Sequence, residues 1–129
     1  MSTRSLSDLV LDEAKLVEEL LAATLRPLVR ISRSGELILE PAFRSLSLAQ
    51  KVLTVIAAAK AMKLLEIRDS EEIGPTEIAL LAGIPVGSVK PSVRALLNNG
   101  DVEATPGGRY TIPLRNLNLL SSMLQGGQR

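Results

Sequence analysis

The residues best suited to chemistry in this chain are two cations and a serine in its second half, with a third cation further on. Lys90 and Arg94 are four residues apart, so on a helix they lie on one face. They can contact phosphate oxygens or guanine edges, and Ser88 can bond a phosphate or a base. Arg109 can reach a minor groove or a sugar–phosphate backbone. These residue types favour binding to nucleic acid over catalysis.

The residues that most enzyme mechanisms use are missing or badly placed. The chain has no cysteine and no histidine, which excludes thiol nucleophiles, histidine acid–base pairs, disulfides and the usual zinc or haem ligands. The carboxylates of Asp12-Glu13 and of Glu71-Glu72 are adjacent, so on a helix they diverge by about 100° and share no proton-transfer site. Gly107-Gly108 lacks the lysine of a phosphate loop and is interpreted as a turn. We therefore expect no enzyme activity, no cofactor and no metal.

Charge and composition restrict the partners further. The 129 residues include 15 basic and 14 acidic side chains, so the net charge is +1 and any basic footprint must be local. Aromatic residues make up 2% of the chain, which argues against base stacking on single strands or RNA. The first eight residues lack an apolar signal region, and the most apolar run, residues 52–59, is too short to span a bilayer. We expect a cytoplasmic protein without a membrane partner.

The stretch from Gly74 to Pro113 must position the candidate side chains, and its pattern predicts a helix, a turn, a second helix and a β-ribbon. Pro75 suits a first helical position, and Gly83, where a positive φ costs little, ends this short helix. The second helix, about residues 85–98, has an apolar stripe at helical spacing. Alternating residues around a Thr-Pro-Gly-Gly turn then predict the ribbon. The stripe contains Val86, Val89, Val93, Leu96 and Leu97, and the ribbon contains Val102, Ala104, Tyr110 and Ile112.

Several short motifs fit this layout, namely Glu77-Ile78-Ala79, Gly83-Ile84, Ser88-Val89, Val93-Arg94-Ala95-Leu96-Leu97, Gly100 and Gly107-Gly108-Arg109-Tyr110. With the helix upstream they cover about residues 47–113, and this segment resembles the winged helix-turn-helix superfamily. The resemblance implies a mainly α fold with small β-hairpins, in which the second helix enters the major groove of DNA.

Two functions stay open, because the superfamily contains DNA-binding regulators and also modules that bind only proteins. The first is a small DNA-binding protein, a transcriptional regulator or a DNA-organising factor, that acts as a homodimer on double-stranded DNA. The second is a protein–protein interaction module without sequence-specific DNA binding. The DNA-binding residues predicted for the first function are Ser88, Lys90, Pro91, Arg94 and Arg109.

One feature of the second helix departs from base readout. Gly87 and Pro91 occupy the middle of its outward face, and neither side chain can hydrogen-bond a base. Pro91 also removes the backbone hydrogen bond to residue 87, which predicts a kink. We interpret this face either as a relaxed helix start or as a smooth surface that lets a DNA backbone or a partner protein approach closely.

The chain divides into three predicted parts: an arm over residues 1–44, the winged domain over 45–113, and a C-terminal amphipathic helix with a frayed tail over 114–129. The arm begins with a helix of about five turns that ends at Leu25 and continues into a hairpin, residues 28–40. Arginines around this hairpin are offset by glutamates, so a solvated hairpin with ion pairs is favoured over phosphate contacts.

Helix signals next to and beyond the arm predict how the molecule assembles. Ser47 begins a capping box, and its helix is expected to run to about Glu66. The two terminal helices have wide leucine faces, which we expect to bury against each other or against a second chain in a C2 dimer. The predicted dimerisation residues are Leu9, Leu16, Leu20, Leu117 and Leu120.

Overall fold

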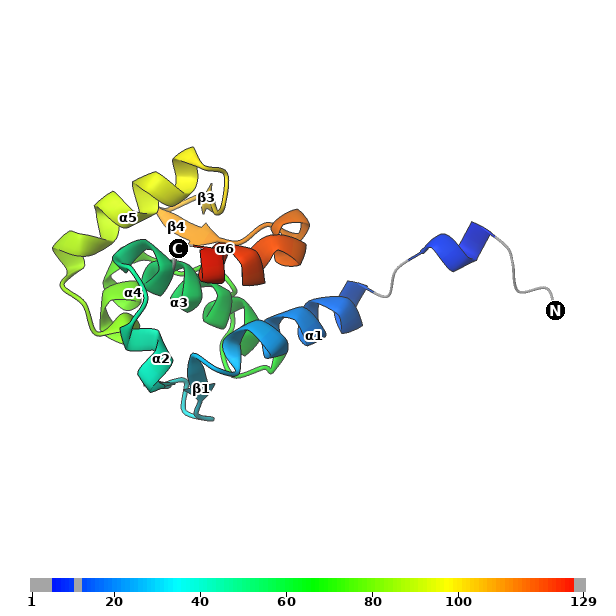
Figure 1. Cartoon of the computed structure of the whole chain (residues 1–129), viewed down its shortest axis with the longest axis horizontal. Helices are drawn as coiled ribbons and strands as arrows, with labels where there is room; N and C mark the ends of the chain where they lie inside the picture. The colour runs from blue at the N-terminus through cyan, green and yellow to red at the C-terminus, as the bar shows by residue number, and fades with distance from the viewer. Residues whose placement is uncertain (1–5, 11–12, 127–129) are drawn as a thin grey trace.

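The computed structural model describes residues 6–10 and 13–126 and shows a mainly helical fold with two small antiparallel hairpins (Figure 1). Helix α3 (Leu48–Leu64) lies at the centre, and α1, α4, α5 and α6 pack around it. Its residues 52–59 are all fully buried, as expected for a helix that is apolar on most sides. The other elements are η1 (a 3-10 helix, Leu6–Leu9), α1 (Glu13–Leu25), β1 (Val29–Ile31), β2 (Leu37–Leu39), α2 (Pro41–Arg44), α4 (Pro75–Ala82), α5 (Val86–Asn98), β3 (Glu103–Thr105), β4 (Arg109–Thr111), η2 (3-10, Leu114–Leu119) and α6 (Leu120–Gly126).

The capping box at the start of α3 is confirmed. The Ser47 hydroxyl accepts from the backbone N–H of Gln50 at 3.1 Å, and the Gln50 side-chain oxygen accepts from the backbone N–H of Ser47 at 2.9 Å. The amide nitrogen of Gln50 then donates to the carbonyl of Leu124 at 3.0 Å. One buried glutamine therefore caps the central helix and ties the C-terminal helix α6 to it.

Helices α4 and α5 lie where the sequence predicts them. Gly83 ends α4 with φ 70° and donates its N–H to the carbonyl of Ala79. The chain then changes direction by 109° between α4 and α5. In the part of the chain that the structure describes, no single helix is both long and apolar enough to cross a membrane, and α4 and α5 meet that requirement only as this bent pair.

Most of the predicted stripe of α5 faces the core. Val89, Val93 and Leu96 are buried, and Leu97 packs partly against them. The prediction for Val86 is wrong, since its side chain is exposed in the first helical turn, beyond the edge of the core. The helix continues through Pro91 to Asn98 without interruption.

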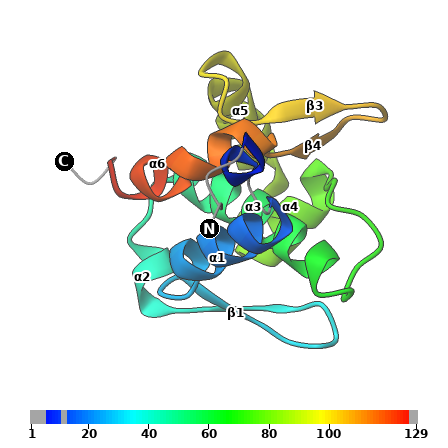
Figure 2. The ribbon, with the colours of Figure 1, turned by 90° about the vertical axis from the view of Figure 1, so that its right-hand side faces the viewer.

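Both predicted hairpins are confirmed, and they lie at opposite ends of the molecule (Figure 2). In the second hairpin Ala104 pairs with Tyr110, the middle residue of β4. Tyr110 also exchanges two backbone hydrogen bonds with Ile73, at 3.0 and 2.9 Å, so β4 is paired on both of its edges. This pairing joins the hairpin to the segment that leads into α4.

The termini differ from the predictions in their helix boundaries. The predicted five-turn first helix is wrong at its start: α1 begins at Glu13, and the preceding 3-10 turn exposes Leu6 and Leu9. The side chains of Leu6 and Leu9 do not pack on the core, and helix formation in proteins depends mainly on such packing. After Pro113 the chain forms η2 and then α6 in place of one continuous helix. Helix α2, with the buried Phe43, was not predicted.

Candidate nucleic-acid interface

The outward face of α5 brings two of the predicted site residues together. Lys90 and Arg94 are both exposed and are separated by one helical turn. Pro91 is exposed beside them, and Ser88 is half-buried near the start of the same helix. Because Val89, Val93 and Leu96 hold the opposite face in the core, α5 presents these cations to solvent on a rigid element.

The charges of α5 differ from those of α4, which carries Glu77 in its first turn. Helix α5 contains no acidic residue. Within residues 6–10 and 13–126, neither Lys90 nor Arg94 makes an ion pair, whereas four other cations do. The two cations of α5 are therefore available to an external anion. The paired cations are Lys60 with Glu71 (2.6 Å), Arg68 with Glu77 (2.6 Å), Arg115 with Glu103 (2.9 Å) and Arg30 with Glu40 (3.8 Å).

Near Pro91 the helix lacks one backbone hydrogen bond and has one side-chain hydrogen bond at the next residue. Pro91 has no N–H, so the carbonyl of Gly87 lacks its usual helical donor. One position along, the hydroxyl of Ser92 donates to the carbonyl of Ser88 at 3.0 Å, in addition to the helical bonding of that turn. Ser92 is buried, and its hydroxyl gives the carbonyl of Ser88 a second donor, whereas the carbonyl of Gly87 receives none from it.

Arg109, which was predicted to contact DNA from the hairpin, packs against the loop before α4. It is half-buried at the start of β4, and its terminal nitrogen donates to the carbonyl of Glu72. Its Nε is buried without a hydrogen-bond partner among the described residues. Its aliphatic part runs beside Gly74, where an added Cβ would lie 4.0 Å from the Arg109 Cγ. The position of Arg109 therefore supports the loop before α4, and its side-chain hydrogen bond is with that loop and not with α5.

The same loop contains an arginine whose role the sequence did not reveal. The side chain of Arg68 is only 16% exposed, and it donates to the carbonyls of Ser70 (2.8 Å) and Glu72 (3.1 Å). It also forms two bonds to Glu77 in the first turn of α4, at 2.6 and 3.1 Å. The carbonyl of Glu72 thus accepts from both Arg68 and Arg109. This cluster fixes α4, and through the turn at Gly83 it fixes the start of α5.

The predicted dimerisation residues separate into three groups. Leu117 and Leu120 are 2% and 0% exposed within the chain itself, so their assignment to a dimer contact is wrong. They belong to the segment η2–α6 that packs on α1 and α3, which is the intramolecular alternative for the leucine faces. Leu16 and Leu20 are half-buried beside η2, where they line a shallow cavity. Leu9 alone of the five is exposed.

Comparisons with protein-family models, curated proteins and solved structures give no match to this chain. The chemistry available on α5 is therefore judged from its own geometry. Two unpaired cations one turn apart can neutralise two phosphates of a duplex backbone, and Arg94 can also form a bidentate contact to guanine. The small side chains at Gly87 and Pro91 leave room for a close approach.

Proposed function

We propose that this chain is a winged helix-turn-helix protein that binds double-stranded DNA through α5 and acts as a homodimer in transcriptional regulation or DNA organisation. The observation that carries the proposal is the pair Lys90 and Arg94, exposed and unpaired on a helix without any acidic residue. The rest of α5 is anchored in the core, so these cations reach a ligand without any rearrangement of the fold.

The arrangement of the elements supports the same proposal. In a typical helix-turn-helix, two helices cross at about 90–120° and are joined by a short turn that often contains glycine. Here α4 and α5 differ in direction by 109°, and Gly83 lies in the turn between them. The hairpin β3–β4 follows α5 directly, in the place of a wing. It is fastened to the loop before α4 through the pairing of Tyr110 with Ile73.

The charges indicate the strength and type of binding. Each phosphate that a cation neutralises adds about 0.9 to the slope of log affinity against log salt, so two contacts give a slope of about −2 per chain. Without a preferred site we expect dissociation constants of roughly 10⁻⁴–10⁻⁶ M. Gly87 and Pro91 cannot read bases, so backbone contacts contribute more than base contacts to the affinity.

The experiment is binding of a fluorescently labelled duplex, followed by anisotropy, at low and at moderate salt. The variant Lys90→Ala/Arg94→Ala is compared with Arg33→Ala/Lys63→Ala, which removes two exposed cations from the first hairpin and α3. We expect the first variant to lose most of the binding and about two units of salt slope, and the control to bind as the wild type. No binding at low salt, a salt-independent signal, or equal losses in both variants would contradict the proposal.

A second function, docking of a partner protein on the same helix pair, is favoured by one specific observation. Leu80 on α4 is 77% exposed and Val86 on α5 is 52% exposed, so apolar side chains lie on both sides of the turn at Gly83. Exposed apolar residues at such a point suit a protein interface better than a phosphate backbone. A pull-down from the native host in the presence of excess duplex tests it with Leu80→Ser/Val86→Ser as the control bait. A protein retained by the wild type and lost by this variant supports docking, whereas recovery of DNA alone excludes it.

A further inference from the structure

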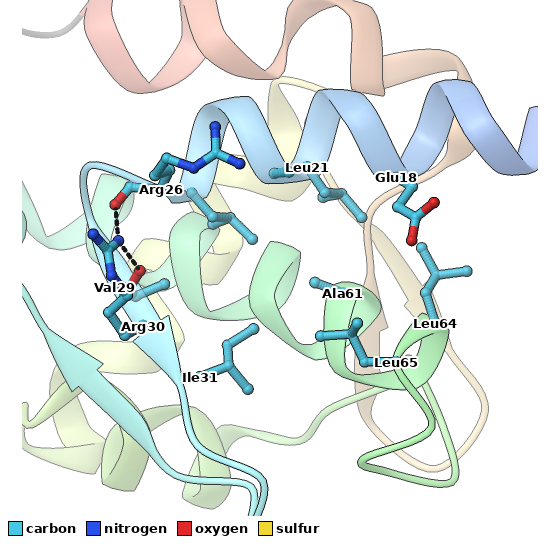
Figure 3. Close-up of a pocket in the computed structure, with 11 residues that line it drawn as sticks. Glu18, Leu21, Arg26, Val29, Arg30, Ile31, Ala61, Leu64 and Leu65 are labelled. Atoms are coloured by element: carbon cyan, nitrogen blue, oxygen red, sulfur yellow. Dashed lines mark hydrogen bonds between the residues drawn. The ribbon is translucent and has the colours of Figure 1, made fainter.

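An open apolar groove lies between α1, strand β1 and the end of α3, on the flank of α1 away from η2 (Figure 3). Its volume is about 450 Å³, and its floor contains Leu21, Leu25 and Val29. On the wall formed by the end of α3 and the residue after it, Leu64 and Leu65 are exposed. Apolar surface in a connected groove of this size is typical of a binding or assembly surface.

The charged residues of the groove lie at its two ends. Figure 3 shows Glu18 at one end and Arg26 with Arg30 at the other. Among the described residues Glu18 and Arg26 make no side-chain hydrogen bond or ion pair, and both are exposed. Arg30 donates to the carbonyls of Arg26 and Val29, and Glu40, 3.8 Å away, offsets its charge, so within the described part of the chain Arg26 is the unpaired cation of this end.

Three of these residues form a stripe that runs along α1 and one residue past its end. Glu18, Ala22 and Arg26 follow one another at intervals of four residues, or about 6 Å along the axis. Arg26 continues the helical geometry, since its N–H donates to the carbonyl of Ala22 at 3.0 Å. The stripe is acidic at one end, small in the middle and basic at the other end.

Such a stripe is its own complement under a two-fold rotation. If a second copy of α1 lies antiparallel across the first, with the axis at Ala22, then Glu18 of each copy meets Arg26 of the other. Isologous C2 contacts require this kind of self-complementary surface. The small side chain at position 22 allows the two helix backbones to approach closely at the crossing point.

We propose that the groove beside α1 is the dimer interface of this protein, and that its occupant is the α1 helix of a second copy. The antiparallel partner helix covers Leu64 and Leu65 and pairs its charges with the two ends of the groove. This inference rests on the homodimer part of the proposed function and places the contact on the flank of α1 opposite to the leucines that pack on η2. It also explains why Leu117 and Leu120 are not needed for assembly, since they are buried within one chain.

The test is sedimentation equilibrium of the full chain, without DNA, on the wild type and three variants. Glu18→Arg and Arg26→Glu each place like charges at both ends of the interface, so each is expected to weaken dimerisation by about tenfold or more. The double variant Glu18→Arg/Arg26→Glu exchanges the two charges and is expected to restore dimerisation to within about threefold of the wild type. Arg44→Glu, on the exposed face of α2, changes the net charge as Arg26→Glu does and is the matched control.

The outcomes separate this inference from other occupants of the groove. A wild type that stays monomeric at tens of micromolar overturns it, as does a dimer that tolerates both single reversals or that the double variant fails to restore. An effect of Arg44→Glu equal to that of Arg26→Glu also overturns it, because net charge would then explain the change. Circular dichroism confirms that each variant is folded. Since α5 is unchanged in all of them, failure of DNA binding and failure of dimerisation are measured independently.

Discussion

Replacing Pro91 by alanine is expected to stabilise the protein, although the residue lies on the surface that we propose to bind DNA. Pro91 is inside α5, six residues after the N-cap Pro85, and it has no N–H to donate to the carbonyl of Gly87. Its side chain is exposed, so its removal creates no cavity in the core. Alanine restores the missing helical hydrogen bond and has the highest helix propensity.

The size of the effect follows from the position in the helix. A proline in the middle of a helix costs about 3 kcal/mol relative to alanine. Here the missing bond is in the second turn and on the exposed side, where water can hydrate the free carbonyl of Gly87. We therefore expect a gain of about 1–2 kcal/mol in the free energy of unfolding, and a rise in Tm of roughly 4–8 °C.

Urea denaturation followed by circular dichroism measures this change, and an unchanged m-value shows that both variants unfold in the same way. The control is Lys90→Ala, which alters the neighbouring exposed position and is expected to change stability by no more than about 0.5 kcal/mol. An unchanged or lower stability of Pro91→Ala would refute the reasoning. It would mean that the local geometry around Ser88 and Ser92 depends on the proline ring.

Two further pairs of variants test the elements that position α4 and α5. Arg68→Ala is expected to reduce the free energy of unfolding by about 1 kcal/mol more than Glu77→Ala does. The arginine side chain also donates to two backbone carbonyls, and it is 16% exposed, whereas the side chain of Glu77 is 42% exposed. Equal losses in urea denaturation would contradict this prediction. Gly83→Ala is expected to cost about 1 kcal/mol, since φ is 70° there. Position 87 has open space around an added Cβ and no positive φ, so Gly87→Ala is expected to raise the free energy of unfolding by about 0.5–1 kcal/mol. If Gly83→Ala and Gly87→Ala shifted the melting temperature in the same direction, this pair of expectations would be contradicted.

The parts of the fold that sequence predicted are those that local chemistry decides. The capping box at Ser47 needs only residues three apart, and the end of α4 at Gly83 needs only a residue that tolerates a positive φ. The alternation around the turns of both hairpins is equally local. On α5, helical spacing was enough to place Lys90 and Arg94 outside and Val89 and Val93 inside.

The parts that sequence did not predict depend on partners far along the chain. Arg109 was expected to project from the hairpin, but the carbonyl of Glu72, 37 residues earlier, accepts its hydrogen bond. Leu117 and Leu120 have the spacing of a free leucine face, and only the tertiary packing shows that α1 and α3 cover it. The groove beside α1 consists of residues from three separate elements, so no single stretch of sequence could reveal it.

The distribution of charges links the proposed interface on α5 to the proposed dimer. Lys60, Arg68 and Arg115 are paired with glutamates, and Arg68 and Arg109 hold the loop before α4, so these cations are occupied in positioning the helices. On the proposed DNA-binding surface, Lys90 and Arg94 would give each chain about two phosphate contacts, which is weak binding at physiological salt. Two copies joined through α1 would bring a second α5 to the same duplex, and the second binding event would then be intramolecular. For a near-neutral chain with so small a basic surface, we therefore expect dimerisation to raise the affinity of the proposed DNA binding.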